Sequence, residues 1–294
     1  MKKTYNLFWT GLLVVSLLLA GCQQPTSNIP ADPVEAIKTI ADKQKDIKSQ
    51  HLDLSIDLGL QADGFQTDSS TASIAALFKN FKASVTATGD VDGAKNDFQF
   101  NGSADLGPFT AFLAQGEDKL TFDLVKVGDT LYSRAAGQDW SSSPFSASTS
   151  DQGNSNESSN NVSPAQLSEL LKKTTKAERL GDESIDGTDS YHFKVTLDPV
   201  ALINELSTMA AAADPSAKVD QQQLDEAQKL LKDSAVDVEV WVGKSDLFVR
   251  QEKIHLNFNL KDIPDQPGAS ALIDLLINAK ISKINEPVTI TAPQ

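Results

Sequence analysis

The side chains best suited to acid–base or metal chemistry in this sequence are three histidines, His51, His192 and His255. Each stands alone within a stretch of alternating apolar and polar residues, on the polar phase of a predicted strand. Their spacing gives no support to a shared metal or acid–base site, although strands of one sheet could bring them together. Exposed histidines without a catalytic role are therefore the favoured interpretation.

No recognised catalytic motif accompanies these histidines. The chain has no G-x-S-x-G nucleophile elbow, no S-x-x-K, no H-E-x-x-H and no glycine loop of the kind that cradles phosphate. Two acidic stretches, Asp90 to Gly93 and Asp182 to Asp189, faintly resemble calcium loops but lack the complete EF-hand spacing. Hairpin turns built on Asp-Gly explain both stretches better. The sequence therefore predicts a protein that is not an enzyme and holds no metal or cofactor.

Cys22 is the only cysteine, so a disulfide within the chain is excluded. Two lysines near the start are followed by an apolar run from Leu7 to Leu19, which is shorter than the roughly 20 residues of a spanning helix and fits a secretory signal peptide. Leu19-Ala20-Gly21-Cys22 resembles the lipobox at which bacterial lipoproteins receive a diacylglycerol thioether. The alternative is an ordinary signal peptide with a chance cysteine. We expect residues 1–21 to be removed and Cys22 to anchor the chain to the extracytoplasmic face of the cell membrane by several acyl chains.

Composition and charge exclude two other classes of protein. The 294 residues are 40% hydrophobic and 22% charged, with 26 basic residues against 40 acidic ones and a net charge of −14. Nucleic-acid binding needs a basic footprint, so no nucleic-acid partner is predicted. The polar content is too high for an integral membrane protein, and the length suffices for one large core or two modest ones.

The elements that follow the anchor begin with a tether and a helix. Residues 22–32 are polar and include two prolines, which indicates a flexible tether. Asp32 as N-cap, Pro33 at the first helical position and Glu35 three residues after the cap predict a helix. Its apolar stripe extends to Ile47, so one face packs on another element.

Strands with one apolar face make up most of the rest. Leu52 to Leu60 alternates strictly between leucine or isoleucine and polar residues or glycine, which is typical of a half-buried strand. Further stretches of this kind lie at 85–91, 98–106, 120–124, 191–197, 236–242, 254–260 and 275–281. Helical patterns at 163–171, 199–210 and 215–231 interrupt them, and the last two are expected to lie across the sheet.

Two segments stand apart from this alternation. Residues 141–163 contain 10 serines, and such a segment buries too little apolar surface to offset its ordering entropy. We interpret it as a loop within a single domain over residues 33–294, with a domain linker as the alternative. The stretch from Ser69 to Asn80 carries a helical stripe of Ile74, Leu77 and Phe78 that continues to Phe81.

These elements predict an α+β fold with a curved antiparallel half-barrel sheet of about 9–11 strands. Sheet twist accumulates over so many strands, so the sheet should curl and the helices should pack in its concave, apolar face. Helices laid against a curved sheet need not fill it completely. An apolar cavity between them is therefore expected.

The order of motifs resembles the LppX/LprAFG family of bacterial lipoproteins. The resemblance is carried by the lipobox, the tether, the capped helix, the Gly-Asp turn before Trp140, the helical insertion and the strand with Trp241. It is also carried by Asp246-Leu247-Phe248-Val249-Arg250 and by Asn285-Glu286-Pro287-Val288-Thr289-Ile290. It implies a fold like that of LolA and LolB, and a cavity that binds acylated lipids or glycolipids and carries them through the envelope. The family supplies no catalytic residues, and both segments that stand apart depart from its pattern.

Candidate ligand contacts are the inward-phase residues of strands expected to be central, with three residues from the helical insertion. They are Ile56, Leu58, Phe98, Phe100, Leu202, Leu206, Met209, Val238, Val240, Leu256 and Phe258. Trp140 and Trp241 are expected to fill core corners rather than to anchor a ligand or membrane headgroups. A lipid carrier tethered to the membrane, with an envelope transporter as a conceivable partner, is the favoured function. A chaperone-like or sensory lipoprotein that binds a protein segment, and a structural surface lipoprotein, are the alternatives.

Overall fold

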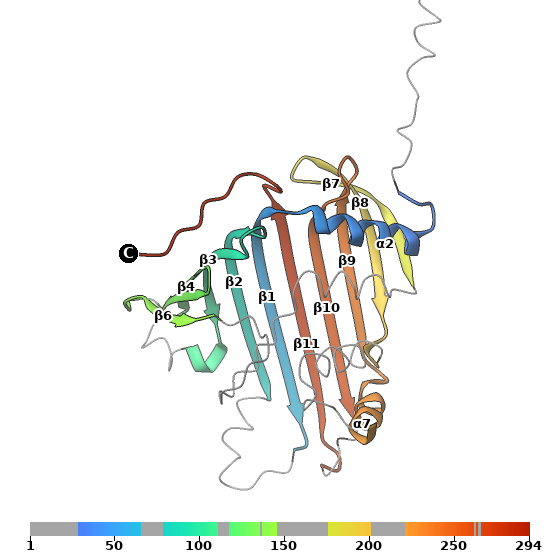
Figure 1. Ribbon diagram of the computed structural model, residues 1–294. Helices are drawn as coiled ribbons and strands as arrows, with labels where there is room; N and C mark the ends of the chain where they lie inside the picture. Colours follow the sequence, from blue (N-terminus) through green and yellow to red (C-terminus); the bar gives the residue numbers. More distant parts are fainter. Residues whose placement is uncertain are drawn as a thin grey trace, which may run out of the picture.

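The computed structural model describes residues 29–65, 79–110, 118–135, 137–145, 176–200, 221–261, 263 and 266–294. Within these ranges the chain forms one antiparallel sheet of 11 strands, open at β6 and β7, with few helices (Figure 1). The strands are β1 (Ser49–Asp63), β2 (Asn80–Asp92), β3 (Asp97–Asp105), β4 (Leu120–Val127), β5 (Thr130–Ala135), β6 (Ser141–Pro144), β7 (Ala177–Ile185), β8 (Thr188–Leu197), β9 (Ala235–Gly243), β10 (Val249–Lys261) and β11 (Ser270–Ser282). The predicted fold class is confirmed.

Strand order places the first strand beside the last. The order is β6-β5-β4-β3-β2-β1-β11-β10-β9-β8-β7, so every neighbouring pair except β1 with β11 is consecutive along the chain. In that central pair Ile56 lies opposite Ile277 and Leu58 opposite Leu275. The apolar phases of the two halves therefore meet on the same face, and one sheet results instead of two.

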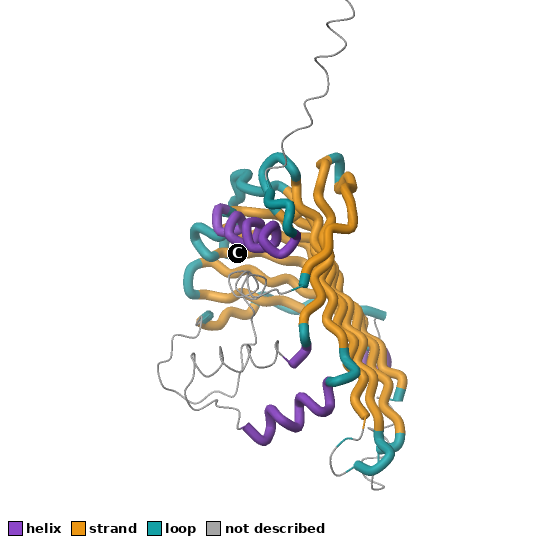
Figure 2. Tube along the Cα trace, turned by 90° about the vertical axis from the view of Figure 1, so that its right-hand side faces the viewer, coloured by secondary structure: helices purple, strands orange, loops and turns teal. Residues whose placement is uncertain are grey.

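The sheet curves strongly, and glycines permit part of this curvature. Figure 2 shows the strands curving round the side on which α2 (Pro33–Lys43) lies. A Cβ built on Gly89 would stand 2.5 Å from the Phe100 ring, and one on Gly102 would stand 2.5 Å from the Phe122 ring. Each ring thus lies directly over a glycine of the next strand. Closely apposed strands of this kind leave no room for a methyl group.

Two helices lie on the concave side, as predicted. The Asp32 carboxylate accepts hydrogen bonds from Val34 N and Glu35 N at 3.0 Å each, which caps α2 as the sequence indicates. The face of α2 that packs on the sheet is fully buried and carries Ala36, Ile37, Ile40 and Ala41. At the opposite end of the strands α7 (Gln221–Leu231) contacts β10 (Figures 1 and 2).

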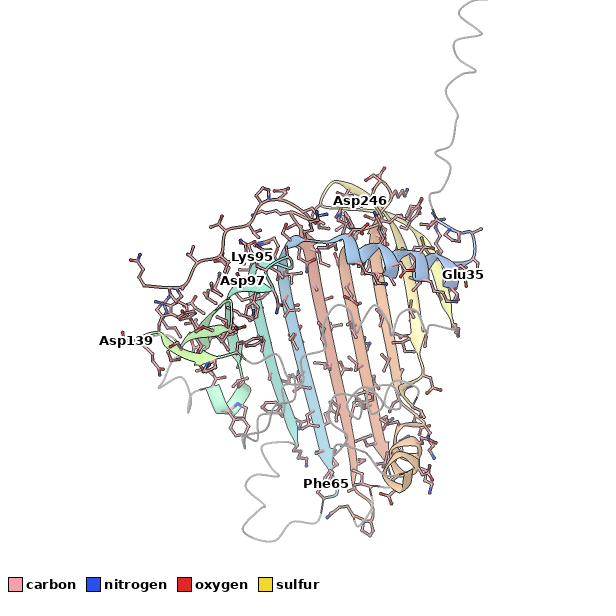
Figure 3. The ribbon with its side chains drawn as sticks, viewed as in Figure 1. Glu35, Phe65, Lys95, Asp97, Asp139 and Asp246 are labelled. Carbon is pink, nitrogen blue, oxygen red and sulfur yellow. The ribbon has the colours of Figure 1, made fainter. Side chains whose placement is uncertain are left out.

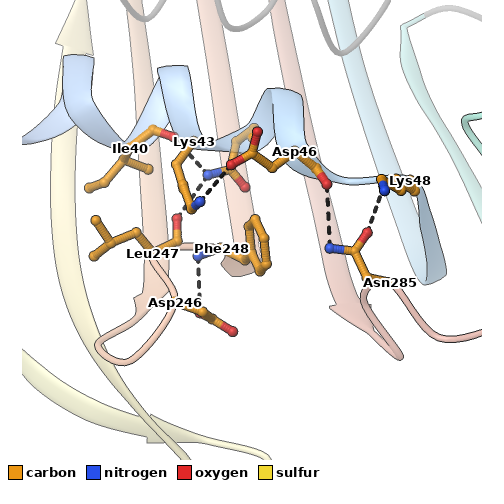
Figure 4. Close-up of polar contacts among 9 residues, drawn as sticks. Ile40, Lys43, Asp46, Lys48, Asp246, Leu247, Phe248 and Asn285 are labelled. Atoms are coloured by element: carbon orange, nitrogen blue, oxygen red, sulfur yellow. Dashed lines mark hydrogen bonds and ion pairs between the residues drawn. The ribbon is translucent and has the colours of Figure 1, made fainter.

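Polar contacts fasten α2 and the C-terminal segment to the sheet (Figure 4). Gln44, in the short 3-10 helix Gln44–Asp46 after α2, donates to Leu247 O at 2.9 Å and accepts from Val249 N at 3.0 Å. Asn285 accepts from Lys48 N at 2.6 Å, and its backbone N–H donates to Ser49 O at 2.8 Å. The chain on both sides of the β1–β11 pair is thereby held in register.

Several sequence predictions are corrected here. The predicted serine loop does not begin at residue 141, because Ser141–Pro144 pairs with β5 as β6. Phe81 lies in β2 rather than on a helical stripe, because Asn80 already begins that strand. Ile47 lies beyond the end of α2, because the 3-10 helix intervenes. The leader, Cys22, most of the tether, residues 146–163 and the predicted helix at 163–171 lie outside the described residues, as do residues 201–210 of the helix predicted at 199–210 and residues 215–220 of the one predicted at 215–231.

Candidate ligand-binding face

The candidate site is the apolar face of the sheet on the side of α2, which we call the inner face. Cross-strand pairing brings the inward phases of successive strands into continuous rows. One row runs Val238, Ile254, Ile277, Ile56, Val85 and Ala104 across β9, β10, β11, β1, β2 and β3. Each strand thus contributes alternate apolar side chains to a single surface.

This inner face has two parts that differ in burial. Beneath α2 the side chains of Phe193, Val195, Val238 and Val240 are buried and form one cluster with the helix. Farther along the strands, toward α7, the inner-face side chains are only half-buried. They are Leu58 and Leu60 of β1, Leu256 and Phe258 of β10, and Ile273 and Leu275 of β11. The first part is core, and the second is accessible apolar surface.

All eight candidate contacts that lie within the described ranges stand on the inner face. Val238 and Val240 belong to the core beneath α2 and are each 1% exposed. The other six are half-buried: Ile56, Leu58, Phe98, Phe100, Leu256 and Phe258. Leu202, Leu206 and Met209 lie outside the described residues. The pairing thus brings β1, β10 and β3 to a common surface, as the alternation predicts.

Glu252 is the inner-face residue that the sequence reasoning missed. It lies opposite Val240 of β9 and Ala279 of β11, in line with apolar residues on both sides. The residue is partly exposed, but its Oε1 atom is fully enclosed and has no hydrogen-bond partner among the described residues. Burial raises the pKa of Glu252 to about 7. The sequence feature that could have identified it is the period-two alternation, because Glu252 lies on the same side of the strand as Ile254 and Leu256.

A second ionisable group, Lys126 of β4, points to the same face but is fully paired. Lys126 pairs across strands with Phe98 and Leu131, and it is 3% exposed. Its ammonium donates to Asn96 O, lies 4.0 Å from Asp97 Oδ1 and stands 5.3 Å from the centre of the Phe145 ring. Lys126 therefore closes one margin of the inner face as a buried ion pair.

The opposite face, here called the outer face, is polar and holds a broad groove of about 660 Å³. The outward side chains that line it come from β1, β2, β3, β4 and β11. They are Asp53, Ser55, Thr86, Thr88, Asn101, Ser103, Thr121, Asp123, Asn278 and Lys280. This groove is not the apolar cavity that the sequence predicts, because hydroxyl, amide and charged side chains line it together with Leu54, Ala87, Gly102 and Phe122.

His51 contacts Thr88, a residue that lines this groove, but the two do not form part of a catalytic triad. Its Nδ1 lies 2.6 Å from Asp90 Oδ1, and its Nε2 lies 3.2 Å from the Thr88 hydroxyl. The connectivity is that of a base and a nucleophile, but Thr88 donates its single hydrogen to Asp53 at 2.6 Å. The hydroxyl therefore offers His51 only an acceptor, and no proton is positioned for transfer to the ring.

The three histidines lie on the outer face, as predicted, but none stands alone. His255 lies in β10, 3.2 Å from Asp274, whereas His51 lies in β1 and His192 in β8. His192 is buried, with Nδ1 2.8 Å from Glu183 and Nε2 2.9 Å from Glu239. The sequence expectation of an exposed, unpartnered side chain is therefore wrong for His192, because carboxylates of β7 and β9 lie on either side of it.

Trp241 completes this cluster. Its ring is 7% exposed and stacks on His192 at 4.2 Å between ring centres, so it fills a buried position as predicted. Its indole N–H donates to Glu183 Oε2 at 3.0 Å. That hydrogen bond, together with the one from His192, lowers the pKa of Glu183 below its usual value. Trp140, by contrast, is half-buried beneath the Arg134 guanidinium at 4.7 Å.

We expect Trp241→Phe to weaken the pH dependence of stability. A depressed carboxyl pKa stabilises the fold above the unfolded value, and this contribution is lost as pH falls through the folded value. Without the indole donor, the Glu183 pKa returns toward its usual range. The stability gap between wild type and variant should therefore narrow as pH falls from about 7 to below about 4, measured by urea unfolding at each pH.

The matched control for this prediction is Glu183→Gln, which removes the titrating group but keeps an acceptor. In the Glu183→Gln background, Trp241→Phe should produce a stability loss that is the same at every pH. A gap between wild type and Trp241→Phe that stays constant over the same pH range would contradict the assignment.

Within the part of the chain that the structure describes, no group of three or more His, Cys, Asp and Glu side chains is arranged to hold a metal ion. None of the helices in these ranges has the length and apolarity needed to cross a membrane.

Comparison with known proteins gives matches in structure but not in sequence. No family model matches the chain, and no curated protein does. The lipoprotein LppX of Mycobacterium tuberculosis is 17% identical, with 87% of this chain and 98% of that one covered and a TM-score of 0.37. LprF of Mycobacterium bovis is 14% identical, with coverages of 90% and 99% and a TM-score of 0.43.

A putative outer membrane lipoprotein-sorting protein domain from Vibrio parahaemolyticus is 10% identical over 86% of this chain and 93% of that one, with a TM-score of 0.22. All three TM-scores lie below 0.5. The fold is therefore defined by the strand pairing of this chain itself.

Proposed function

We propose that this chain is a lipid-anchored extracytoplasmic lipoprotein that binds an acylated lipid or glycolipid on its inner face and carries it through the cell envelope. One observation carries the proposal. The inner face is apolar across successive strands, yet the part toward α7 is only half-buried, at Leu58, Leu256 and Phe258 among others. A large apolar surface that the protein's own side chains leave accessible is suited to an acyl chain.

The predicted anchor and the contacts of the histidines in the described ranges support the same function. The Leu19-Ala20-Gly21-Cys22 motif provides for attachment to the membrane, and a tethered domain stays close to a source of lipid. Each histidine in the described ranges contacts a carboxylate of a neighbouring strand, and the Thr88 hydroxyl beside His51 donates its hydrogen to Asp53. Binding without catalysis, with an envelope transporter as a partner for loading or release, is the proposed mode of action.

The first test is ligand binding by residues 23–294 produced without the lipobox. Native and denaturing mass spectra of one sample, with a lipid extract, should reveal an acyl lipid at near-stoichiometric amount. For uncharged probes added to delipidated protein, affinity should rise about fourfold for each methylene group, because burial of one CH₂ contributes about 0.8 kcal/mol.

A blocking variant locates the site. Leu256→Trp adds a bulky ring to the half-buried part of the inner face, so we expect affinity for a pyrene-labelled fatty alcohol to fall by about tenfold or more. Asn259→Trp, three positions along the same strand and on the outer face, is the matched control and should bind normally. Equal binding by the two variants, or a co-purifying peptide that lipid does not displace, would argue against the proposal.

A further inference from the structure

Glu252 is the feature of the inner face that an ordinary apolar core does not explain. An enclosed carboxyl oxygen without a hydrogen bond costs about 1–3 kcal/mol or more. It lies where the buried part of the inner face meets the half-buried part, between Val240, which is 1% exposed, and Ala279, which is half-buried. Both neighbours offer it only aliphatic groups, and Oε1 has no partner in the described part of the chain. The position destabilises the fold, which points to a use in binding.

Charged groups on the surrounding elements are engaged elsewhere. On β10 itself, Arg250 is paired with Asp246, and Lys253 projects from the outer face toward Glu239 at 3.8 Å. On β11, Lys280 projects from the outer face and lies 3.7 Å from Asp186, and Asp274 is bound to His255.

The charges of β9 and α2 are likewise turned away. On β9, Asp237 binds Lys194 at 3.1 Å on the outer face. On the exposed side of α2, Lys38 binds Glu35 and Lys43 binds Asp46. Burial alone accounts for the raised pKa of Glu252, so within the described part of the chain no charge compensates this carboxyl.

We propose that Glu252 is the polar contact of the inner face for its ligand, and that this ligand carries a hydrogen-bond donor, a hydroxyl or an ammonium, beside its acyl chains. This inference rests on the proposed function and adds the chemical class of the ligand. A carboxylate only accepts hydrogen bonds, so a donor satisfies it, whereas a purely hydrocarbon ligand leaves it unpaired. A ligand carboxylate would place two like charges together.

The protonation of Glu252 makes this selectivity depend on pH. Above about 7 the side chain is ionised and accepts only, so donors are favoured. Below about 7 it is protonated and both donates and accepts, so an ester oxygen binds as well as a hydroxyl does. The preference of the inner face for ligands that carry a hydrogen-bond donor should therefore be strong in mild alkali and weak in mild acid.

The experiment measures displacement of the pyrene-labelled fatty alcohol by 1-dodecanol, dodecylamine and methyl dodecanoate, at about pH 8.5 and about pH 5.5. At the higher pH the better of the two donors should bind about tenfold or more tighter than the ester, as expected for a hydrogen bond to a charged group. At the lower pH the difference should fall to about threefold or less. A preference for dodecylamine alone would identify an ammonium, and a preference for 1-dodecanol would identify a hydroxyl.

Three variants isolate the role of the carboxyl. Glu252→Met should keep binding of all probes but lose the preference for donors, and its unfolding midpoint should be at least that of wild type. Glu252→Gln should bind alcohol and ester with similar affinity at both pH values. Asp57→Asn, which removes an exposed carboxylate from the outer face of β1, is the control and should behave as wild type.

The outcomes separate the two proposals. If no probe binds the wild-type protein, the proposed function fails, and the inference about Glu252 fails with it. If the probes bind but alcohol, amine and ester bind equally at the higher pH, or if Glu252→Met keeps the preference, only the role of Glu252 is overturned.

Discussion

Phe193→Ala should lower the free energy of unfolding by about 3–5 kcal/mol. Phe193 is 1% exposed, lies opposite Val240 and meets the Tyr191 ring at 6.3 Å. Its removal leaves a cavity between β8, β9 and α2, and the two strands are fixed by backbone pairing and cannot close over it. Urea unfolding followed by circular dichroism measures the loss as a lower midpoint with an unchanged slope.

The control for this prediction is Lys194→Ala, the next residue of the same strand. Lys194 lies on the outer face, where its ammonium is 3.1 Å from Asp237, and an ion pair at such exposure contributes about 0–1 kcal/mol. A similar loss in both variants would mean that α2 and the inner face do not form the main core.

Lys126→Ala should lower the free energy of unfolding by a similar amount, because it removes the counter-charge of a buried carboxylate. Lys126 and Asp97 are both buried, and the Asp97 carboxylate also accepts a hydrogen bond from Gly128 N–H at 2.8 Å. Removal of the ammonium leaves a buried carboxylate without its counter-charge, which costs about 3–5 kcal/mol. Figure 3 shows Asp97 beside Lys95 at the β2–β3 turn, at the end of the sheet that α2 crosses, with Phe65 at the opposite end.

A double variant separates the charge from the packing of Lys126. Asp97→Asn in the Lys126→Ala background should recover part of the lost stability, because the uncompensated charge is gone. Lys95→Ala, at an exposed position that pairs with Asp92 at 3.2 Å, should change stability by about 0.5 kcal/mol or less. If the double variant is no more stable than Lys126→Ala, the loss comes from packing.

Local signals made much of the fold predictable. The Asp32 cap, the turn at Asp186-Gly187 and the strict alternation from Leu52 to Leu60 each depend on neighbouring residues, and each is present as predicted. Alternation also assigns a face to every residue of a strand, because side chains point to opposite sides in turn. The six half-buried candidates on the inner face follow from that rule alone.

Which residues of a face are buried could be decided only from the tertiary structure. Val240 and Leu256 follow the same sequence pattern, but Val240 is covered by α2 while Leu256 is half-buried. Glu252 occupies an inward phase beside them, but an isolated carboxyl in an apolar strand draws no attention until its enclosure is known. Likewise, His192 is buried only because Glu183 and Trp241 arrive from β7 and β9.

The sequence by itself determined most of the strand segments, where most of their hairpin turns lie and which side of these strands is apolar, because these depend on contacts between near neighbours. Only the tertiary structure decided that β1 pairs with β11, so that Ile56 meets Ile277 and two runs of strands become one curved sheet. A period of two fixes the phase of a strand but not its partner, since any strand of matching phase could pair there. Closure of the central pair across more than 200 residues (Asp63 to Ser270) therefore depends on the whole chain.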